Sequence, residues 1–152
     1  MKSSSKIPRR AAVWAAAAAG LVLLIAGCQS TPGAPAGISL VVHDQNLFFS
    51  GGYYTVYRVF TDGPSWIVIY NSEKGAPGEI IGKEKIQGGQ RYDVRVYVDI
   101  NKRTETLYAK LHVDAGKIGE FEFPGPDEVI ILDEKEVATS FKDLSMGINK
   151  MK

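Results

Sequence analysis

The densest group of chemically active side chains in this sequence lies in its C-terminal half. It comprises one histidine and four carboxylates: His112, Asp114, Glu120, Glu122 and Asp127. Residues two apart on a strand share a face, so His112 and Asp114 would point the same way. An imidazole together with carboxylates can hold a divalent cation, and oxygens alone can hold calcium. If the strands predicted at 104–113 and 119–123 pair, the sequence predicts a divalent-metal site formed by His112, Asp114, Glu120 and Asp127.

The same residues also fit a purely structural interpretation, and the sequence leaves both open. Their spacing matches no standard metal-ligand motif. In the structural interpretation Asp114 caps the backbone amides of the loop at 115–119, and His112 makes a hydrogen bond to that loop. The chain has no Gly-x-Ser-x-Gly elbow, and residues 78–84 lack the spacing of a phosphate-binding loop. We therefore predict no enzymatic activity.

The only cysteine, Cys28, belongs to a separate motif near the N-terminus. Ile25, Ala26 and Gly27 precede it, which resembles the lipobox that prolipoprotein-processing enzymes read. The thiol of Cys28 would accept a diacylglyceryl group, and the small residues would let the peptidase reach the bond before it. We predict a signal peptide at 1–27 and lipidated Cys28 with a flexible linker at 28–37. The lipid would anchor the chain in a bilayer.

The leader also separates two regions of opposite charge. Residues 1–27 contain four basic residues and no acidic ones, followed by an apolar run that is short for a membrane-spanning helix. Removing the leader leaves 14 basic and 17 acidic residues, a net charge of −3. A mature chain with that charge does not have the basic balance typical of nucleic-acid-binding proteins, so we expect no nucleic-acid partner.

Beyond the linker, short β-rich runs alternate with Gly, Pro, Asn and Asp, which is typical of all-β domains. Trp66 to Tyr70 is apolar on both faces and fits a central strand, with Trp66 in the core. We predict an immunoglobulin-like antiparallel β-sandwich of seven to nine strands at 38–142 and a C-terminal tail at 143–152. The expected strands are 38–43, 53–60, 65–70, 79–86, 91–99, 104–113, 119–123, 128–132 and 137–141.

A cluster of aromatic residues occupies the first half of this domain. Its members are Phe48, Phe49, Tyr53, Tyr54, Tyr57 and Phe60. Core packing and cross-strand pairing explain most of them. Because both faces of the strand carry rings, we expect some to point outward and to form a patch that binds carbohydrate or protein. Five cations are expected on solvated faces: Arg58, Arg91, Arg95, Lys102 and Arg103.

Two segments give the sequence a family resemblance. Residues 111–116, Leu-His-Val-Asp-Ala-Gly, and residues 119–127, which contain Glu-Phe-Pro-Gly-Pro-Asp, resemble the signature of an uncharacterised domain. That domain recurs in secreted and surface proteins of haloarchaea and some bacteria, and the similarity extends over about 38–142. The resemblance implies an extracellular β-sandwich without an established activity. Relatives often carry histidine where this chain has Tyr70, which puts a two-histidine metal site in doubt here.

These features together predict a lipoprotein on the extracytoplasmic face of the cell membrane, or of the outer membrane in an organism that has one. Its β-domain would be a non-enzymatic binding or structural module, with an envelope protein or polysaccharide as partner. Two alternatives remain. The domain could bind a divalent metal through His112 and nearby carboxylates, or it could be an accessory subunit of a membrane redox or transport complex. No other cofactor is expected.

Overall fold

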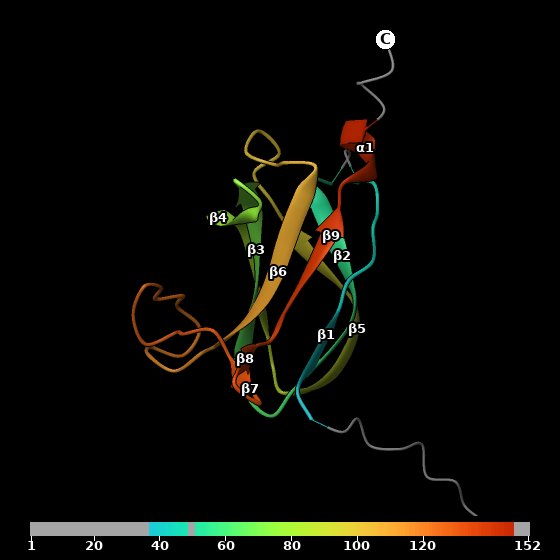
Figure 1. Cartoon of the computed structure of the whole chain (residues 1–152). Helices are drawn as coiled ribbons and strands as arrows, with labels where there is room; N and C mark the ends of the chain where they lie inside the picture. Colours follow the sequence, from blue (N-terminus) through green and yellow to red (C-terminus); the bar gives the residue numbers. More distant parts are fainter. Residues whose placement is uncertain (1–36, 49–50, 148–152) are drawn as a thin grey trace, which may run out of the picture. The chain divides into compact units, whose positions relative to one another are not determined.

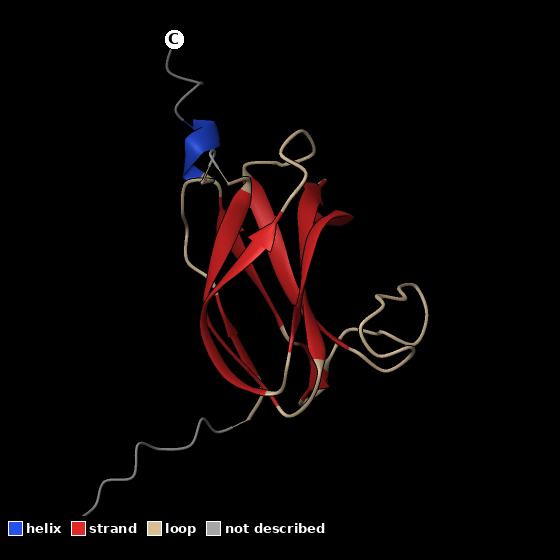
Figure 2. Ribbon diagram, turned by 180° about the vertical axis from the view of Figure 1, so that it is seen from behind, coloured by secondary structure: helices blue, strands red, loops and turns tan. Residues whose placement is uncertain are grey.

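The computed structural model describes residues 37–48 and 51–147. Within them the chain forms strands in three antiparallel sheets and one helical turn, α1 (Leu144–Gly147). One sheet has the order β1-β2-β5 and another the order β4-β3-β6-β9, while β7 and β8 form a hairpin (Figures 1 and 2). The strands are β1 (Ser39–Val41), β2 (Tyr53–Thr61), β3 (Ser65–Glu73), β4 (Ala76–Ile86), β5 (Gly89–Tyr97), β6 (Thr106–Val113), β7 (Ile131–Leu132), β8 (Lys135–Glu136) and β9 (Ala138–Lys142).

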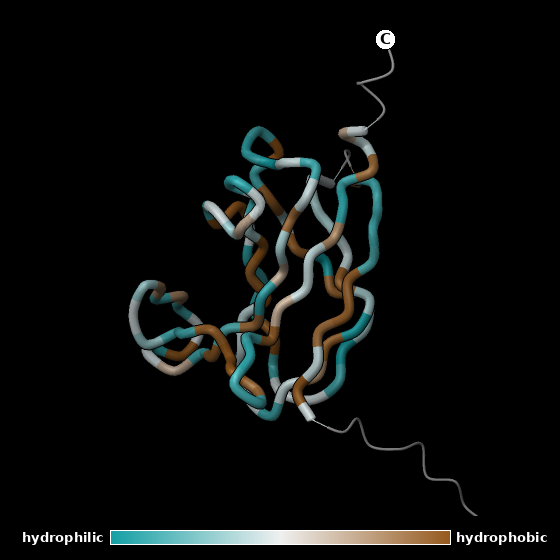
Figure 3. The backbone as a smooth tube through the Cα atoms, in the orientation of Figure 1, coloured by the Kyte–Doolittle hydropathy of each residue, from teal (hydrophilic) through white to brown (hydrophobic). Residues whose placement is uncertain are grey.

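The two larger sheets enclose one apolar core, so the predicted all-β sandwich is confirmed. Tyr54 and Val56 of β2 belong to the same buried cluster as Ile67 of β3 and Leu107 of β6. The rings of Tyr54 and Phe141 meet across the two layers with their centroids 5.3 Å apart. Strands alternate buried and exposed residues because one face packs inward and the other meets solvent. In Figure 3 the apolar segments accordingly run mainly along the strands.

Glycine lets the two sheets approach each other along one edge. Gly82 of β4 forms an isolated bridge to Val98, just beyond β5. A side chain at position 82 would collide with the carbonyl oxygen of Tyr97. This contact explains a glycine inside a strand, where it otherwise weakens packing.

Strand β3 lies between β4 and β6 and is buried from Ser65 to Tyr70, as the apolar run predicted. Ile67 and Ile69 face the core between the sheets. Trp66, Val68 and Tyr70 form a second buried cluster, with Phe121 packed against it. Trp66 is thus buried as expected, but it packs in this second cluster and not in the main core.

The strand predicted at 119–123 is wrong. These residues lie in the long loop between β6 and β7, the orange loop of Figure 1. Their alternation of Phe and Glu arises because Phe121 packs on Trp66, at 5.5 Å between ring centroids, while Glu122 is exposed. Glu122 donates its backbone N–H to the carboxylate of Asp127 at 2.9 Å. That amide is therefore satisfied by a side chain and not by a neighbouring strand.

Two hairpins differ in their ends from the sequence prediction. Residues 76–78, which precede the strand predicted at 79–86, begin β4, and the turn is made by Lys74 and Gly75. Asp133 and Glu134 turn the β7–β8 hairpin, whose strand β8 was not predicted. All four turn residues have positive φ, between 50° and 83°. Two consecutive residues of positive φ are the geometry that closes a two-residue antiparallel hairpin.

Packing continues past residue 142 into the segment predicted as a tail. Asp143 is fully buried, and its carboxylate accepts a hydrogen bond from the Tyr54 hydroxyl at 2.8 Å. The Nε of Arg103 lies 3.3 Å from the same carboxylate oxygen, and only 17% of this side chain is exposed, so the solvated position predicted for Arg103 is wrong. Asp143 also accepts the backbone N–H of Ser145 at 2.9 Å, at the start of α1. Burial, followed by the hydrogen bond to Asp143, raises the pKa of Tyr54 far above its ordinary value.

We predict that Tyr54→Phe lowers the free energy of unfolding by about 1–3 kcal/mol, because it removes a donor from a buried carboxylate while keeping the ring. Urea denaturation followed by tryptophan fluorescence measures this change. Tyr57→Phe is the matched control, since Tyr57 is half exposed (50%) and its hydroxyl has no partner among the hydrogen bonds of the described residues. Equal stability of the two variants would show that the Tyr54–Asp143 bond does not support the sandwich.

Candidate functional site

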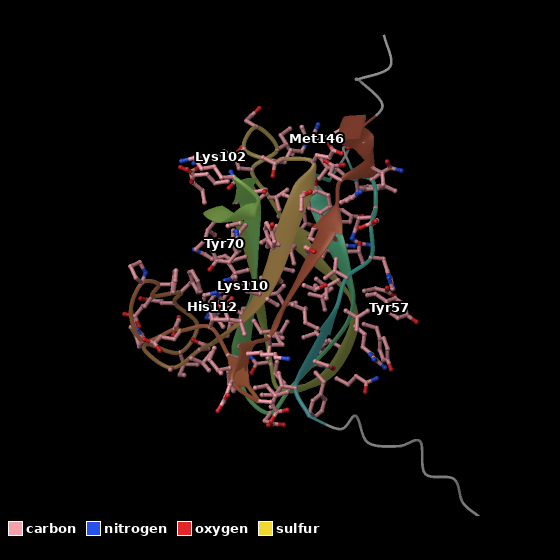
Figure 4. The ribbon with its side chains drawn as sticks, in the orientation of Figure 1. Tyr57, Tyr70, Lys102, Lys110, His112 and Met146 are labelled. Carbon is pink, nitrogen blue, oxygen red and sulfur yellow. The ribbon has the colours of Figure 1, made fainter. Side chains whose placement is uncertain are left out.

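The structure offers two regions where chemistry-bearing side chains gather, and the first surrounds His112. His112 lies on β6 and is fully buried. Its Nε2 lies 2.8 Å from the Tyr70 hydroxyl, and its Nδ1 lies 2.8 Å from the backbone carbonyl oxygen of Asp127 (Figure 4). Because a carbonyl oxygen only accepts, we place the imidazole proton on Nδ1, and Nε2 then accepts the hydroxyl proton of Tyr70. Both ring nitrogens are therefore occupied by groups of the protein.

Apolar rings surround this pair. The ring centroids of Phe121 and Phe123 lie 5.5 Å and 4.9 Å from that of His112, and the ring of Tyr70 is stacked at 6.1 Å. Burial lowers the pKa of His112, although its hydrogen bond to the Asp127 backbone acts in the opposite direction. Burial also raises the pKa of Tyr70 to about 12. The pair is thus held neutral at ordinary pH.

Carboxylates organise the loop that covers this pair. Asp127 is fully buried and accepts backbone N–H groups from Ala115 at 2.9 Å, Gly116 at 3.3 Å and Glu122 at 2.9 Å. Burial of Asp127 acts to raise its pKa, but these donors prevail and the pKa lies below its ordinary value. A charged carboxylate that accepts several backbone donors is among the stronger hydrogen-bond arrangements in proteins.

Asp114 plays a similar part at the start of the loop. Both of its carboxylate oxygens lie 2.9 Å from the backbone N–H of Gly119, and Nζ of Lys85 lies 3.5 Å away. Gly125 makes the bend near the other end, since a Cβ there would stand 2.6 Å from the Glu122 carbonyl oxygen. Asp114 thus caps the 115–119 loop, as the structural interpretation expects, whereas the hydrogen bond of His112 goes to Asp127, beyond residues 115–119.

The predicted metal ligands are distributed differently from a coordination shell. His112 has both nitrogens engaged, and Asp114 and Asp127 point their oxygens at backbone amides. Glu120 is exposed and pairs with Lys117, while Glu122 accepts the Lys117 backbone N–H at 2.6 Å. Within residues 37–48 and 51–147 no three His, Cys, Asp or Glu side chains gather in a way that could hold a metal ion. The geometry favours a structural role for this cluster.

The second region is the outward face of β2 and β5. The β2–β5 pairing sets Tyr53 opposite Tyr97, Thr55 opposite Arg95, and Arg58 opposite Tyr92. Tyr57, Tyr92 and Tyr97 are each at least half exposed. We call Tyr53, Tyr57, Arg58, Tyr92, Arg95 and Tyr97 the tyrosine–arginine face. Figure 4 shows Tyr57 on the side of the sandwich away from Tyr70 and His112.

The rings of this face contact one another along both strands. The Tyr53 and Tyr97 centroids are 5.5 Å apart, and those of Tyr57 and Tyr92 are 6.4 Å apart. Phe48 stacks on Tyr53 at 4.9 Å, and His43 lies 5.1 Å from Tyr57. The sequence predicted outward rings here, but not the contribution of β5, because only the strand register brings Tyr92 and Tyr97 beside β2. Phe49 lies outside the described residues.

A family comparison covers most of the chain. The family described as "Domain of unknown function (DUF7282)" matches residues 38–142. The chain belongs to this family. No curated protein and no solved structure matches the chain. The DUF7282 domain of this chain therefore contains both regions, the loop-covered His112 pair and the tyrosine–arginine face.

The predicted lipidation motif belongs to a part of the chain that the structure does not describe. Ile25, Ala26, Gly27 and Cys28 all lie outside the described residues. Within the described parts of the DUF7282 chain, no helix is both long and apolar enough to cross a membrane.

We predict that His112 makes the stability of the domain depend on pH. Its folded pKa lies below the unfolded value near 6.5, so the unfolded chain binds the proton more tightly. The contribution of His112 is therefore complete above pH 6.5 and decreases as the pH falls toward the folded pKa. Urea midpoints at pH 7.5 and pH 5 should differ more in the wild type than in His112→Gln. His43→Gln should keep the wild-type difference; an unchanged pH dependence in His112→Gln would contradict the assignment.

Proposed function

We propose that this protein is a lipid-anchored, extracytoplasmic lipoprotein whose β-sandwich is a non-enzymatic binding module. The tyrosine–arginine face is the binding surface, and its four tyrosines on two paired strands are the observation that carries the proposal. Exposed aromatic side chains that adjoin one another mark interaction sites on soluble domains. Tyrosine suits such a surface because it offers a large apolar ring with a polar end at low cost in conformational entropy.

The anchor is supported by the sequence around Cys28. The basic leader, the apolar run and the Ile-Ala-Gly-Cys motif agree with each other, and the Pro- and Gly-containing linker follows directly. The resemblance of residues 111–127 to secreted and surface proteins agrees with export of the domain. In this proposal the lipid holds the domain at the membrane and the tyrosine–arginine face engages an envelope component.

We also propose that the sandwich is of the immunoglobulin-like type. The order β1-β2-β5 corresponds to strands A, B and E of that fold, and β4-β3-β6-β9 corresponds to C′, C, F and G. The chain order and the antiparallel pairing agree with this correspondence. A strand equivalent to D is absent from the described residues, where β4 is followed directly by β5.

The anchor can be tested by mass spectrometry of the chain purified from the membranes of the organism that encodes it. We expect a mature N-terminus at Cys28 that carries two or three acyl chains. Cys28→Ser should abolish lipid attachment and processing, whereas Ser30→Ala should keep both. A wild-type chain that still begins at Met1 without lipid would refute the anchor.

The binding role can be tested by sedimentation of the domain, produced from Gly33 onward, with washed envelope fragments of the same organism. We expect Tyr57→Ser combined with Tyr92→Ser to lower the bound fraction roughly threefold or more, because stacking surface is lost. Ile118→Ser combined with Leu132→Ser is the matched control, since it removes exposed apolar side chains elsewhere. Equal binding by both double variants would exclude this face as the binding surface.

A further inference from the structure

We infer that the tyrosine–arginine face binds an anionic polysaccharide whose acidic groups are carboxylates. This inference rests on the proposed function, since it assumes that the face is the binding surface and adds the chemical class of the partner. Three observations support it: which cations occupy the face, how they are arranged with the rings, and how far the rings extend.

The cations of β2 and β5 are all arginines. After Cys28 the chain contains four arginines and ten lysines. Arg58, Arg91 and Arg95 lie on these two strands, which contain no lysine, and the fourth arginine, Arg103, pairs with buried Asp143. A planar guanidinium can hold a carboxylate through two parallel N–H···O bonds, which an ammonium group cannot do.

Arg58 and Arg95, the two arginines of the face, have free capacity for an external acid. Both are exposed, and neither forms an ion pair with an acidic side chain of the described residues. Arg91 is opposite the buried Val59 and so lies on the other side of β5. Asp93 is the only acidic residue on β2 and β5. The face is therefore locally positive on a chain whose part after the leader has a net charge of −3. That contrast favours an anionic partner at this surface.

The arginines are interleaved with the rings. The guanidinium of Arg95 lies 5.1 Å from the centroid of the Tyr53 ring, and Arg58 pairs with Tyr92 across the strands. A guanidinium over an aromatic ring keeps its in-plane N–H donors available. Sugar rings present apolar C–H faces that pack on aromatic rings, while their carboxylates project from the ring edge. The face thus offers stacking surface and carboxylate donors next to each other.

The extent of the face indicates a polymer. Tyr53 and Tyr57 are four residues apart on β2, which corresponds to about 13 Å along a strand. One sugar ring cannot contact both ends of such a surface, but successive residues of a chain can. Each of the four exposed or half-exposed rings carries a hydroxyl and lies on a strand, not on a protruding apolar loop. This arrangement favours a hydrated polysaccharide over insertion into a lipid surface.

The test uses alginate, a polymer of uronic acids, with dextran as the neutral polymer and vesicles of phosphatidylglycerol as an anionic lipid surface. The described sandwich lies within one compact unit, Gly33–Lys152, so the chain from Gly33 onward serves as the protein. Its mobility is measured in native gels cast with each polymer and by co-sedimentation with the vesicles. We expect retardation by alginate that decreases with added salt, and little retardation by dextran.

Single substitutions locate the site. Arg58→Ala and Arg95→Ala should each weaken alginate binding roughly tenfold, because each removes a bidentate carboxylate contact. Arg58→Lys should recover only part of the loss. Lys135→Ala is the matched control: it removes an exposed cation from β8 and should leave binding unchanged. Circular dichroism melts show whether each variant is folded before its binding is compared.

Three results would overturn the inference. Equal retardation by dextran would show that charge plays no part. Binding to vesicles without binding to alginate would assign the face to the membrane. Absence of binding to alginate would exclude carboxylated polysaccharide. In each case the envelope sedimentation of Tyr57→Ser combined with Tyr92→Ser decides separately whether the face is still the binding surface.

Discussion

Strand β3 is buried on both faces, and the rest of the domain is arranged to satisfy that constraint. One face is covered by the opposite sheet, in the manner of any sandwich. The other face carries Trp66, Val68 and Tyr70, which would be exposed to solvent if no loop covered them. Each large apolar side chain removed from water contributes about 1.5–3 kcal/mol. The free energy gained by covering this second face therefore compensates for the cost of holding a long loop in one conformation.

The loop between β6 and β7 achieves this through the buried polar groups of Asp127, His112 and Tyr70, each of which has a hydrogen-bond partner. Asp127 accepts backbone amides from the start and the middle of the loop, and its own carbonyl accepts the proton of His112. His112 in turn accepts the Tyr70 hydroxyl proton, which connects the loop to β3. A half-satisfied network of this kind would cost more than an apolar core. The histidine and carboxylates that resemble a metal site are thus used to fix the cover over β3.

Because the polar residues around His112 hold the loop in place, the surface left open to solvent is the outer face of the opposite sheet. The β1-β2-β5 sheet has no covering loop among the described residues. Apart from Asp93, its exposed side chains are tyrosines and arginines, where an ordinary solvated face would carry lysine and glutamate. The two sheets of the sandwich therefore differ in their outer faces. One is closed by the loop and supports the fold, while the other presents rings and guanidinium groups to the surroundings.

The sequence by itself determined the all-β class, most strands and the central position of β3, because these follow from local alternation and from runs of apolar residues. It also limited the roles of Asp114 and His112 to two interpretations. Tertiary structure alone decided that 119–123 is loop, that Trp66 lies outside the main core, and that Tyr92 and Tyr97 join the aromatic residues of β2. The physical reason is the same in each case. Alternation along the chain indicates which side chains are apolar enough to be buried. Which surface covers them, and which strand lies beside them, depends on contacts between residues far apart in the chain.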